Sequence, residues 1–185
     1  MVRTTDDDMH AIQPKNGENL HKYLHNDFYF LTDPDEFIFK LRADDDEKQL
    51  LKQPVTLDQF VDMPYTWSPF FLLGLKFDEP TSAVLNTDSR GNVEVKIRLP
   101  SAETIQFAHK LSYADSTTQD RTDYDSKKLN QFVSCSIDGR LALFSVHVPE
   151  PGSYFLLVYA ASCGATVADG ACMFKIVYVE PISEA

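Results

Sequence analysis

A strict alternation of apolar and charged residues in the second half of the chain constrains the fold most strongly. Residues 93–99 carry Val, Val, Ile and Leu at the odd positions and Glu, Lys and Arg at the even positions. Residues two apart on a β-strand point to the same side of a sheet, so one side of this strand meets a core and the other meets water. The pattern therefore predicts an antiparallel sheet with one buried face.

Further segments of this kind follow residue 80 and are separated by turn residues. The expected strands are 82–86, 93–99, 104–113, 130–137, 140–148, 153–161 and 171–179. Asp138-Gly139 lies between two of them and suits the positive φ angles of a tight type I′ hairpin. About seven strands at these spacings predict a mainly β fold, an immunoglobulin-like antiparallel β-sandwich.

A tyrosine at the start of the expected strand 153–161 favours the immunoglobulin-like type. The turn Pro-Glu-Pro-Gly at residues 149–152 is followed by Ser153 and Tyr154. In immunoglobulin-like domains a tyrosine at the start of strand F bonds back to the preceding turn, and two residues later antibodies carry a disulfide cysteine. That position is Leu156 here, so we expect a sandwich stabilised by packing alone. Trp67 lies outside the expected strand C and adds no support.

The residues before the strands have a different character. We expect a flexible leader at residues 1–19, a helical or irregular extension at 20–79 and the sandwich at 80–181. Asp33-Pro34 predicts a helix start, with Asp as the N-cap and Pro at the first helical position. Thr56 and Gln59 predict a capping box for a second short helix.

Two other segments of the extension also carry predictions. The acidic run at residues 44–47 is interpreted as a solvated turn. The longest apolar run, residues 70–75, is broken by Gly74 and followed by Lys76, which favours a buried strand over a membrane span.

Charge and cysteine content limit the environment and the partners. The net charge of -11 and the isoelectric point near 4.7 disfavour nucleic acid or an anionic membrane surface as partner and favour basic proteins. An odd number of cysteines and the absence of an N-x-S/T acceptor favour a reducing compartment. Because acidic residues at positions 6–8 stand where a signal peptide would be apolar, we expect a cytoplasmic protein.

One catalytic arrangement is conceivable from the order of residues alone. Cys135, His147 and Asp169 follow the chain order of papain-like enzymes. Cys135 alternates with Val133 and Ile137, so we expect its side chain to point into the sandwich and to act as a small hydrophobe. A strand interior offers neither a helix N-terminus nor a cation to lower the thiol pKa. We therefore predict no catalytic residue.

The remaining candidate ligands also favour structural roles. Cys163 and Cys172 flank a loop between two strands that we expect to pair, and free thiols are favoured over a disulfide. A zinc site would need a second Cys or His pair at ligand spacing. His109 shares the apolar face of its strand and is interpreted as half-buried. The acidic loop 115–125 has either a solvated role or a calcium site. No cofactor or metal is predicted.

A long motif near the N-terminus resembles a known family. Residues 26–38, Asn-Asp-Phe-Tyr-Phe-Leu-Thr-Asp-Pro-Asp-Glu-Phe-Ile, are similar to the stretch that follows the transglutaminase-like core of the kyphoscoliosis-peptidase and hillarin family. The similarity continues through Gln49-Leu50-Leu51, Pro54 and residues 57–60, with Lys48 where the family has Trp. With the Pro-Gly-Ser-Tyr turn and the last strand, it covers about residues 22–180.

The resemblance implies a division of labour between two parts of such proteins. The family's Cys, His, Asp triad lies upstream of this motif, where this chain has only about 25 residues and no Cys. Family members associate with the cytoskeleton through partners such as filamins and septins, which implies a non-catalytic protein-interaction or structural module. Two alternatives stay open: a fragment of a transglutaminase-like cysteine peptidase whose catalytic core is missing, and a calcium-dependent adhesion sandwich.

Overall fold

The protein is described from a computed structural model, which describes residues 32–100, 105–114 and 126–179. The chain forms two compact units, residues 1–60 and residues 61–185. The expected boundary between extension and sandwich at residue 80 stays a prediction.

Short helical turns make up the described part of the first unit. Helix α1, Pro34–Phe37, begins with the expected proline, although the Asp33 side chain makes no capping hydrogen bond. Helix α2, Leu57–Asp62, has the expected capping box. The Gln59 amide N donates to Thr56 Oγ1 at 3.3 Å, and the Thr56 amide N donates to Gln59 Oε1 at 2.9 Å.

The acidic run is exposed, as expected, and leads into a 3₁₀ helix, η3, at Asp46–Gln49. The buried Gln49 side chain closes the loop that follows. Its Nε2 donates to the Ala43 and Val55 carbonyls, both at 3.1 Å, and its Oε1 accepts from the Val55 amide N at 2.7 Å. The Gln49 side chain thus pairs with backbone groups of Ala43 and Val55, which lie outside any helix or strand.

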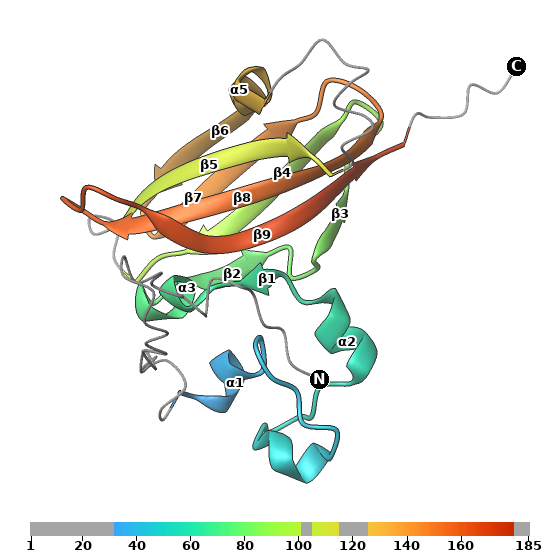
Figure 1. The fold of residues 1–185 in the computed structure, drawn as a ribbon, viewed down its shortest axis with the longest axis vertical. Helices are drawn as coiled ribbons and strands as arrows, with labels where there is room; N and C mark the ends of the chain where they lie inside the picture. The colour runs from blue at the N-terminus through green and yellow to red at the C-terminus, as the bar shows by residue number, and fades with distance from the viewer. Residues whose placement is uncertain (1–31, 101–104, 115–125, 180–185) are drawn as a thin grey trace, which may run out of the picture. The chain divides into compact units, whose positions relative to one another are not determined.

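Two β-sheets form the second unit (Figure 1). The first contains β1 Tyr65–Thr66, β9 Asp169–Tyr178, β8 Gly152–Ser162 and β5 Ile105–Tyr113 in that order, with β3 Val84–Asn86 also paired to β9. The second contains β2 Lys76–Glu79, β4 Asn92–Arg98, β7 Leu141–His147 and β6 Val133–Asp138 in order. Every pair is antiparallel except β3 with β9. The mainly β, immunoglobulin-like fold class is confirmed, with nine strands among the described residues instead of about seven.

The alternating pattern builds the core as predicted. On β4 the apolar side chains of Val95 and Ile97 are fully buried, and on β7 those of Ala142 and Phe144 are fully buried. Phe144 meets Phe107 of β5 edge to face across the sandwich, with ring centroids 5.5 Å apart. Burying each large apolar side chain stabilises a fold by about 1.5–3 kcal/mol.

Two predicted strands are partly helical instead. Residues 70–75 do not form a strand, because Ser68–Leu72 is helix α3 with Pro69 in its first turn. Residues 130–132 form the 3₁₀ helix η4, Asn130–Phe132, which follows α5, Ser126–Leu129. The apolar side chains remain buried at Phe70 and Leu75. A short apolar run carries no period that separates a buried helix from a buried strand.

The hairpin between β6 and β7 differs from the expected turn type. Asp138 pairs with Leu141, so the two loop residues are Gly139 and Arg140. Gly139 has φ +56°, whereas Arg140 is not among the residues with positive φ. A positive φ at the first loop position alone is the pattern of type II′, so the prediction of type I′ was wrong.

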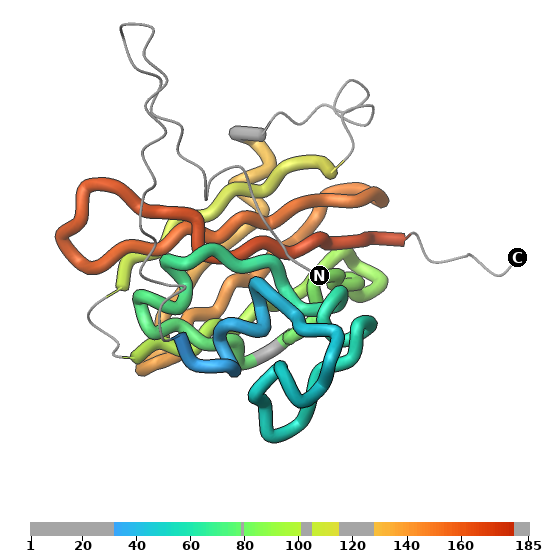
Figure 2. Tube along the Cα trace, turned by 60° about the horizontal axis from the view of Figure 1, so that its bottom comes forward, coloured from blue at the N-terminus to red at the C-terminus, as the bar shows by residue number. Residues whose placement is uncertain are grey.

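The tyrosine corner is confirmed. Tyr154 is fully buried, and its Oη donates to the Glu150 carbonyl O at 2.7 Å. Leu156, at the position of the antibody cysteine, is also fully buried. The loop 163–168 between β8 and β9 projects away from the strands (Figure 2).

Candidate interaction surface

The sheet register separates the members of the conceivable triad. Cys135 lies opposite Phe144, whose side chain enters the core. His147 is three residues from Phe144 on β7, so the two side chains point to opposite faces of the sheet. The His147 side chain therefore lies on the outer face with that of Ser145, on the side opposite to Cys135. Asp169 pairs with Ala160 in the other sheet. These three residues do not assemble a catalytic site.

The expected burial of Cys135 was wrong. The register places it on the core-facing side of β6, but the thiol is exposed. The reason is that β6 is the last strand of its sheet. Neighbouring atoms still desolvate the thiol and raise its pKa, which keeps it protonated and poorly nucleophilic at neutral pH.

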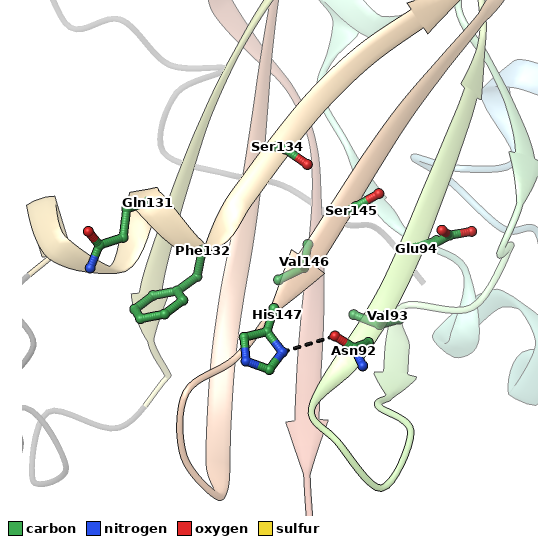
Figure 3. A pocket seen from close by; sticks show the side chains of 9 residues that line it. All are labelled: Asn92, Val93, Glu94, Gln131, Phe132, Ser134, Ser145, Val146 and His147. Carbon is green, nitrogen blue, oxygen red and sulfur yellow. Dashed lines mark hydrogen bonds between the residues drawn. The ribbon is translucent and has the colours of Figure 1, made fainter.

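An open groove of about 440 Å³ crosses the outer face of β4, β7 and β6 (Figure 3). It is lined mainly by polar side chains: Asn92, Glu94, Gln131, Ser134, Ser145 and His147, with Val93, Phe132 and Val146. Phe132 lies beside His147, with ring centroids 6.2 Å apart. The groove is open, as a surface for a partner is, and does not enclose a substrate as a pocket does.

A hydrogen-bonded chain orients the end of this groove. The Asp88 carboxylate accepts from the Asn92 Nδ2 at 3.0 and 3.2 Å and from the Asn92 amide N at 2.8 Å. These bonds hold the pKa of Asp88 below its usual value. They also direct Asn92 Oδ1 toward His147 Nδ1, 2.9 Å away (Figure 3). Because an amide oxygen only accepts, Nδ1 is the donor in this contact.

A second hollow, of about 330 Å³, lies at the other end of the same face. It is lined by Asp78, Arg98, Arg140 and Leu141. Asp78 forms an ion pair with Arg98, and Arg140 Nε donates to the Leu99 carbonyl at 3.1 Å. These charges are engaged in holding β2, β4 and the β6–β7 turn.

The other candidate ligands stand apart from one another. Cys163 is an exposed free thiol, and Cys172 is a fully buried free thiol on β9 whose pKa is raised by burial. His109 is half-buried on β5, as predicted. The acidic loop 115–125 lies outside the described residues. Among the described residues, no group of three or more His, Cys, Asp or Glu side chains is placed to hold a metal ion.

None of the described helices has both the length and the apolar character that a membrane span requires.

The groove was not predictable from the sequence. The even positions of residues 93–99 indicated a solvated face, but Asn92, Phe132 and His147 meet only because three strands and η4 converge. No local signal connects positions so far apart in the chain.

Comparisons with known proteins agree with this architecture. Residues 57–185 match the model of the family described as KY-like, immunoglobulin-like domain. Hillarin of Drosophila melanogaster is 38% identical over 153 residues, covering 80% of this chain and 18% of hillarin. The Lim and transglutaminase domain protein ltd-1 of Caenorhabditis elegans is 30% identical over 184 residues, covering 91% of this chain and 25% of ltd-1.

Kyphoscoliosis peptidase of Mus musculus is 34% identical over 80 residues, which cover 43% of this chain and 12% of that protein. The chain thus matches a quarter or less of the length of each of these curated relatives.

Proposed function

This chain belongs to the family of KY-like immunoglobulin-like domains, and from that membership we propose that it is a non-catalytic protein-interaction and structural module of a transglutaminase-like protein. One relative contains a transglutaminase domain by name and another is a peptidase by name. The regions that match this chain are small parts of both.

The register of β6 and β7 carries this proposal. It directs Cys135 and His147 to opposite faces of one sheet, so the chain's own thiol and imidazole do not form a nucleophile and base. The polar groups instead line open hollows on the outer face of that sheet. A domain arranged in this way acts through its surfaces and strand edges.

The partners that this module suits are basic proteins of the cytoplasm, including cytoskeletal ones. The net charge of -11 attracts basic surfaces and repels nucleic acids and anionic membranes. The cytoskeletal assignment rests on the resemblance to the kyphoscoliosis-peptidase and hillarin family.

The name of the mouse relative favours a second role, as the companion of a peptidase core. In that role the sandwich would position or restrain a catalytic domain. Addition of the chain to a separately produced transglutaminase-like core would then change the core's rate of peptide hydrolysis.

Retention of native partners tests the first role. The full chain and residues 57–185 are immobilised and exposed to native lysate, and bound proteins are identified after a salt wash. Residue 57 is chosen because truncation at residue 80 removes β1 and β2. We expect both forms to retain the same cytoskeletal proteins. Retention of none by either form contradicts the proposal, as does peptide hydrolysis by the chain that disappears in Cys135→Ser.

A further inference from the structure

The two edges of the first sheet are both protected. The outer side of β9 is occupied by β1, through Tyr65 and Thr66, and by β3, residues 84–86. On the outer side of β5, the Asn130 Oδ1 accepts from the Leu111 amide N at 2.7 Å, and α5 and η4 pack against the strand. Natural sheets avoid unwanted pairing by covering their edges in these ways.

The two edges of the second sheet differ from each other. β2 is short, has a bulge between Phe77 and Glu79, and carries the charged Lys76 and Asp78. Bulges and charges on a short strand discourage pairing. β6 has no bulge and carries its one charged residue, Asp138, only at its end, since it reads Val-Ser-Cys-Ser-Ile-Asp and pairs in regular register with β7. Within the described residues, no strand pairs with the outer side of β6.

The core-facing side of β6 is also uncovered from Cys135 onward, whereas Val133 on the same side is buried. Ile137 lies opposite Ala142 and Cys135 opposite Phe144, and both partners are fully buried. Yet Ile137 is 43% exposed and Cys135 is exposed. On β5, the edge strand of the first sheet, the core-facing side chains of Ile105 and Leu111 are buried by contrast. The core-facing side chains of Cys135 and Ile137 therefore lack the cover that their partners on β7 have.

We propose that β6 is a docking edge that accepts one extended segment of a partner protein, with alternating apolar and basic residues, as an additional strand. This inference rests on the proposed function as an interaction module. The segment's backbone would bond to the outward N–H and C=O groups of β6. Its apolar side chains would cover Cys135 and Ile137, and its other side chains would lie on the outer face beside Ser134 and Ser136.

Charge decides which kind of segment fits. Asp138 ends β6, and Glu94 lies on the same outer face in the row of Ser134. Lys96 and Arg98 of β4 lie on this face too, in the rows of Ser136 and Asp138, and Arg98 is paired with Asp78, so the charge of the whole chain sets the preference. A net charge of -11 adds a long-range attraction for basic residues at those outer positions. The same charge repels a second copy of this chain, which disfavours pairing of β6 with itself.

A defined peptide tests the edge in the full chain. The probe is a peptide with uncharged, capped termini and about nine residues, long enough for one strand, that alternates Lys and Val. A peptide of the same composition with its Lys and Val residues grouped into blocks is the control for charge. We expect the alternating peptide to slow amide hydrogen exchange across residues 133–138 by about tenfold or more at saturation, and the block peptide to leave it unchanged.

Two matched substitutions locate the effect. Ile137→Glu buries a charge under the added strand and should weaken binding of the alternating peptide by about tenfold or more. Val84→Glu is the control, because Val84 is also a β-branched residue that is 43% exposed on a strand, and it changes the net charge equally. Because both positions are exposed, we expect both variants to melt within a few degrees of the unsubstituted chain.

Several results would overturn the edge proposal. Slow exchange of the β6 amides without peptide means that the edge is already covered. Self-association that Ile137→Glu abolishes would make a second copy of the chain the occupant. Equal binding of the block peptide would show that the alternation is not recognised, and equal binding of an alternating Glu-Val peptide would show that the basic charge is not. If Ile137→Glu still retains the lysate partners while the peptide fails, the edge proposal fails and the proposed function stands.

Discussion

Gly91 occupies the turn between β3 and β4, where a side chain has no room. Its φ is +81°, and an added Cβ would lie 2.5 Å from the Val148 carbonyl O. Gly91→Ala therefore combines an unfavourable φ with a backbone clash and should lower the free energy of unfolding by about 2 kcal/mol or more.

Urea unfolding of Gly91→Ala beside Gly139→Ala separates those two causes. Gly139 also has a positive φ, +56°, but nothing lies within 4 Å of its added Cβ. Gly139→Ala should therefore cost about 1 kcal/mol, the conformational part alone. Equal losses in the two variants would contradict the clash.

The buried hydroxyl of Tyr154 contributes through one directed hydrogen bond. Tyr154→Phe keeps the ring but leaves the Glu150 carbonyl without its 2.7 Å donor. We expect a loss of about 1–2 kcal/mol in the free energy of unfolding. Tyr178→Phe is the comparison, because its hydroxyl reaches the Ser89 carbonyl only at 3.4 Å on the surface and should cost less.

Cys172 should make the protein less stable at alkaline pH. Burial raises the pKa of its thiol, so the folded chain keeps the proton at a pH where the unfolded chain loses it. The stability that this provides is fully present below the ordinary thiol pKa of about 8.5 and is lost as pH rises above it. The free energy of unfolding should thus fall between about pH 8.5 and 10, by up to about 1.4 kcal/mol per pH unit.

Denaturant unfolding across this range, with Cys172→Ala and Cys163→Ala, tests the assignment. Cys172→Ala should show the shallower decline, while Cys163→Ala, which removes an exposed thiol, should follow the unsubstituted chain. Parallel slopes for all three proteins would rule out Cys172 as the cause.

The outer edge of β5 is held by a hydrogen bond to η4. Asn130 of η4 provides the acceptor for the Leu111 amide N at 2.7 Å. Asn130→Ala should lower stability by about 1–2 kcal/mol and speed exchange of the Leu111 amide. Gln131→Ala, at the exposed neighbouring position, should do neither. An unchanged Leu111 exchange rate in Asn130→Ala would show that the edge is covered by other groups.

Elements with a repeated local pattern were predictable, and those without one were not. The alternation of residues 93–99 and 140–148 predicted β4 and β7, and the Thr56 and Gln59 spacing predicted the start of α2. Residues 70–72 became the end of helix α3 because Pro69 opens a helix as readily as it bounds a strand. β1 and β2 form through pairing with distant strands, and no local period predicts them.

The extent of the sandwich within the chain follows from these short strands. Phe77 of β2 stacks on Phe70, with centroids 4.4 Å apart, and meets Phe174 of β9 at 5.7 Å. Residues 57–185 keep this cluster, whereas residues 80–185 lose Phe70 and Phe77. We expect the longer form to melt cooperatively and the shorter form to lose its cooperative transition, as measured by calorimetry. Equal melting of both would place the boundary near residue 80, where the sequence suggested it.

From the sequence alone, periodicity determined that this chain forms a β-sandwich and which face of each long strand is buried. The Pro-Glu-Pro-Gly-Ser-Tyr turn determined the immunoglobulin-like type and the corner that Tyr154 closes. Periodicity also predicted correctly that Cys135 lies on the core-facing side of β6. Only the tertiary structure decided that Cys135 and Ile137 are nevertheless exposed. The physical reason is that a side chain's direction follows from its own strand, whereas its cover depends on which distant strands lie beside and above it.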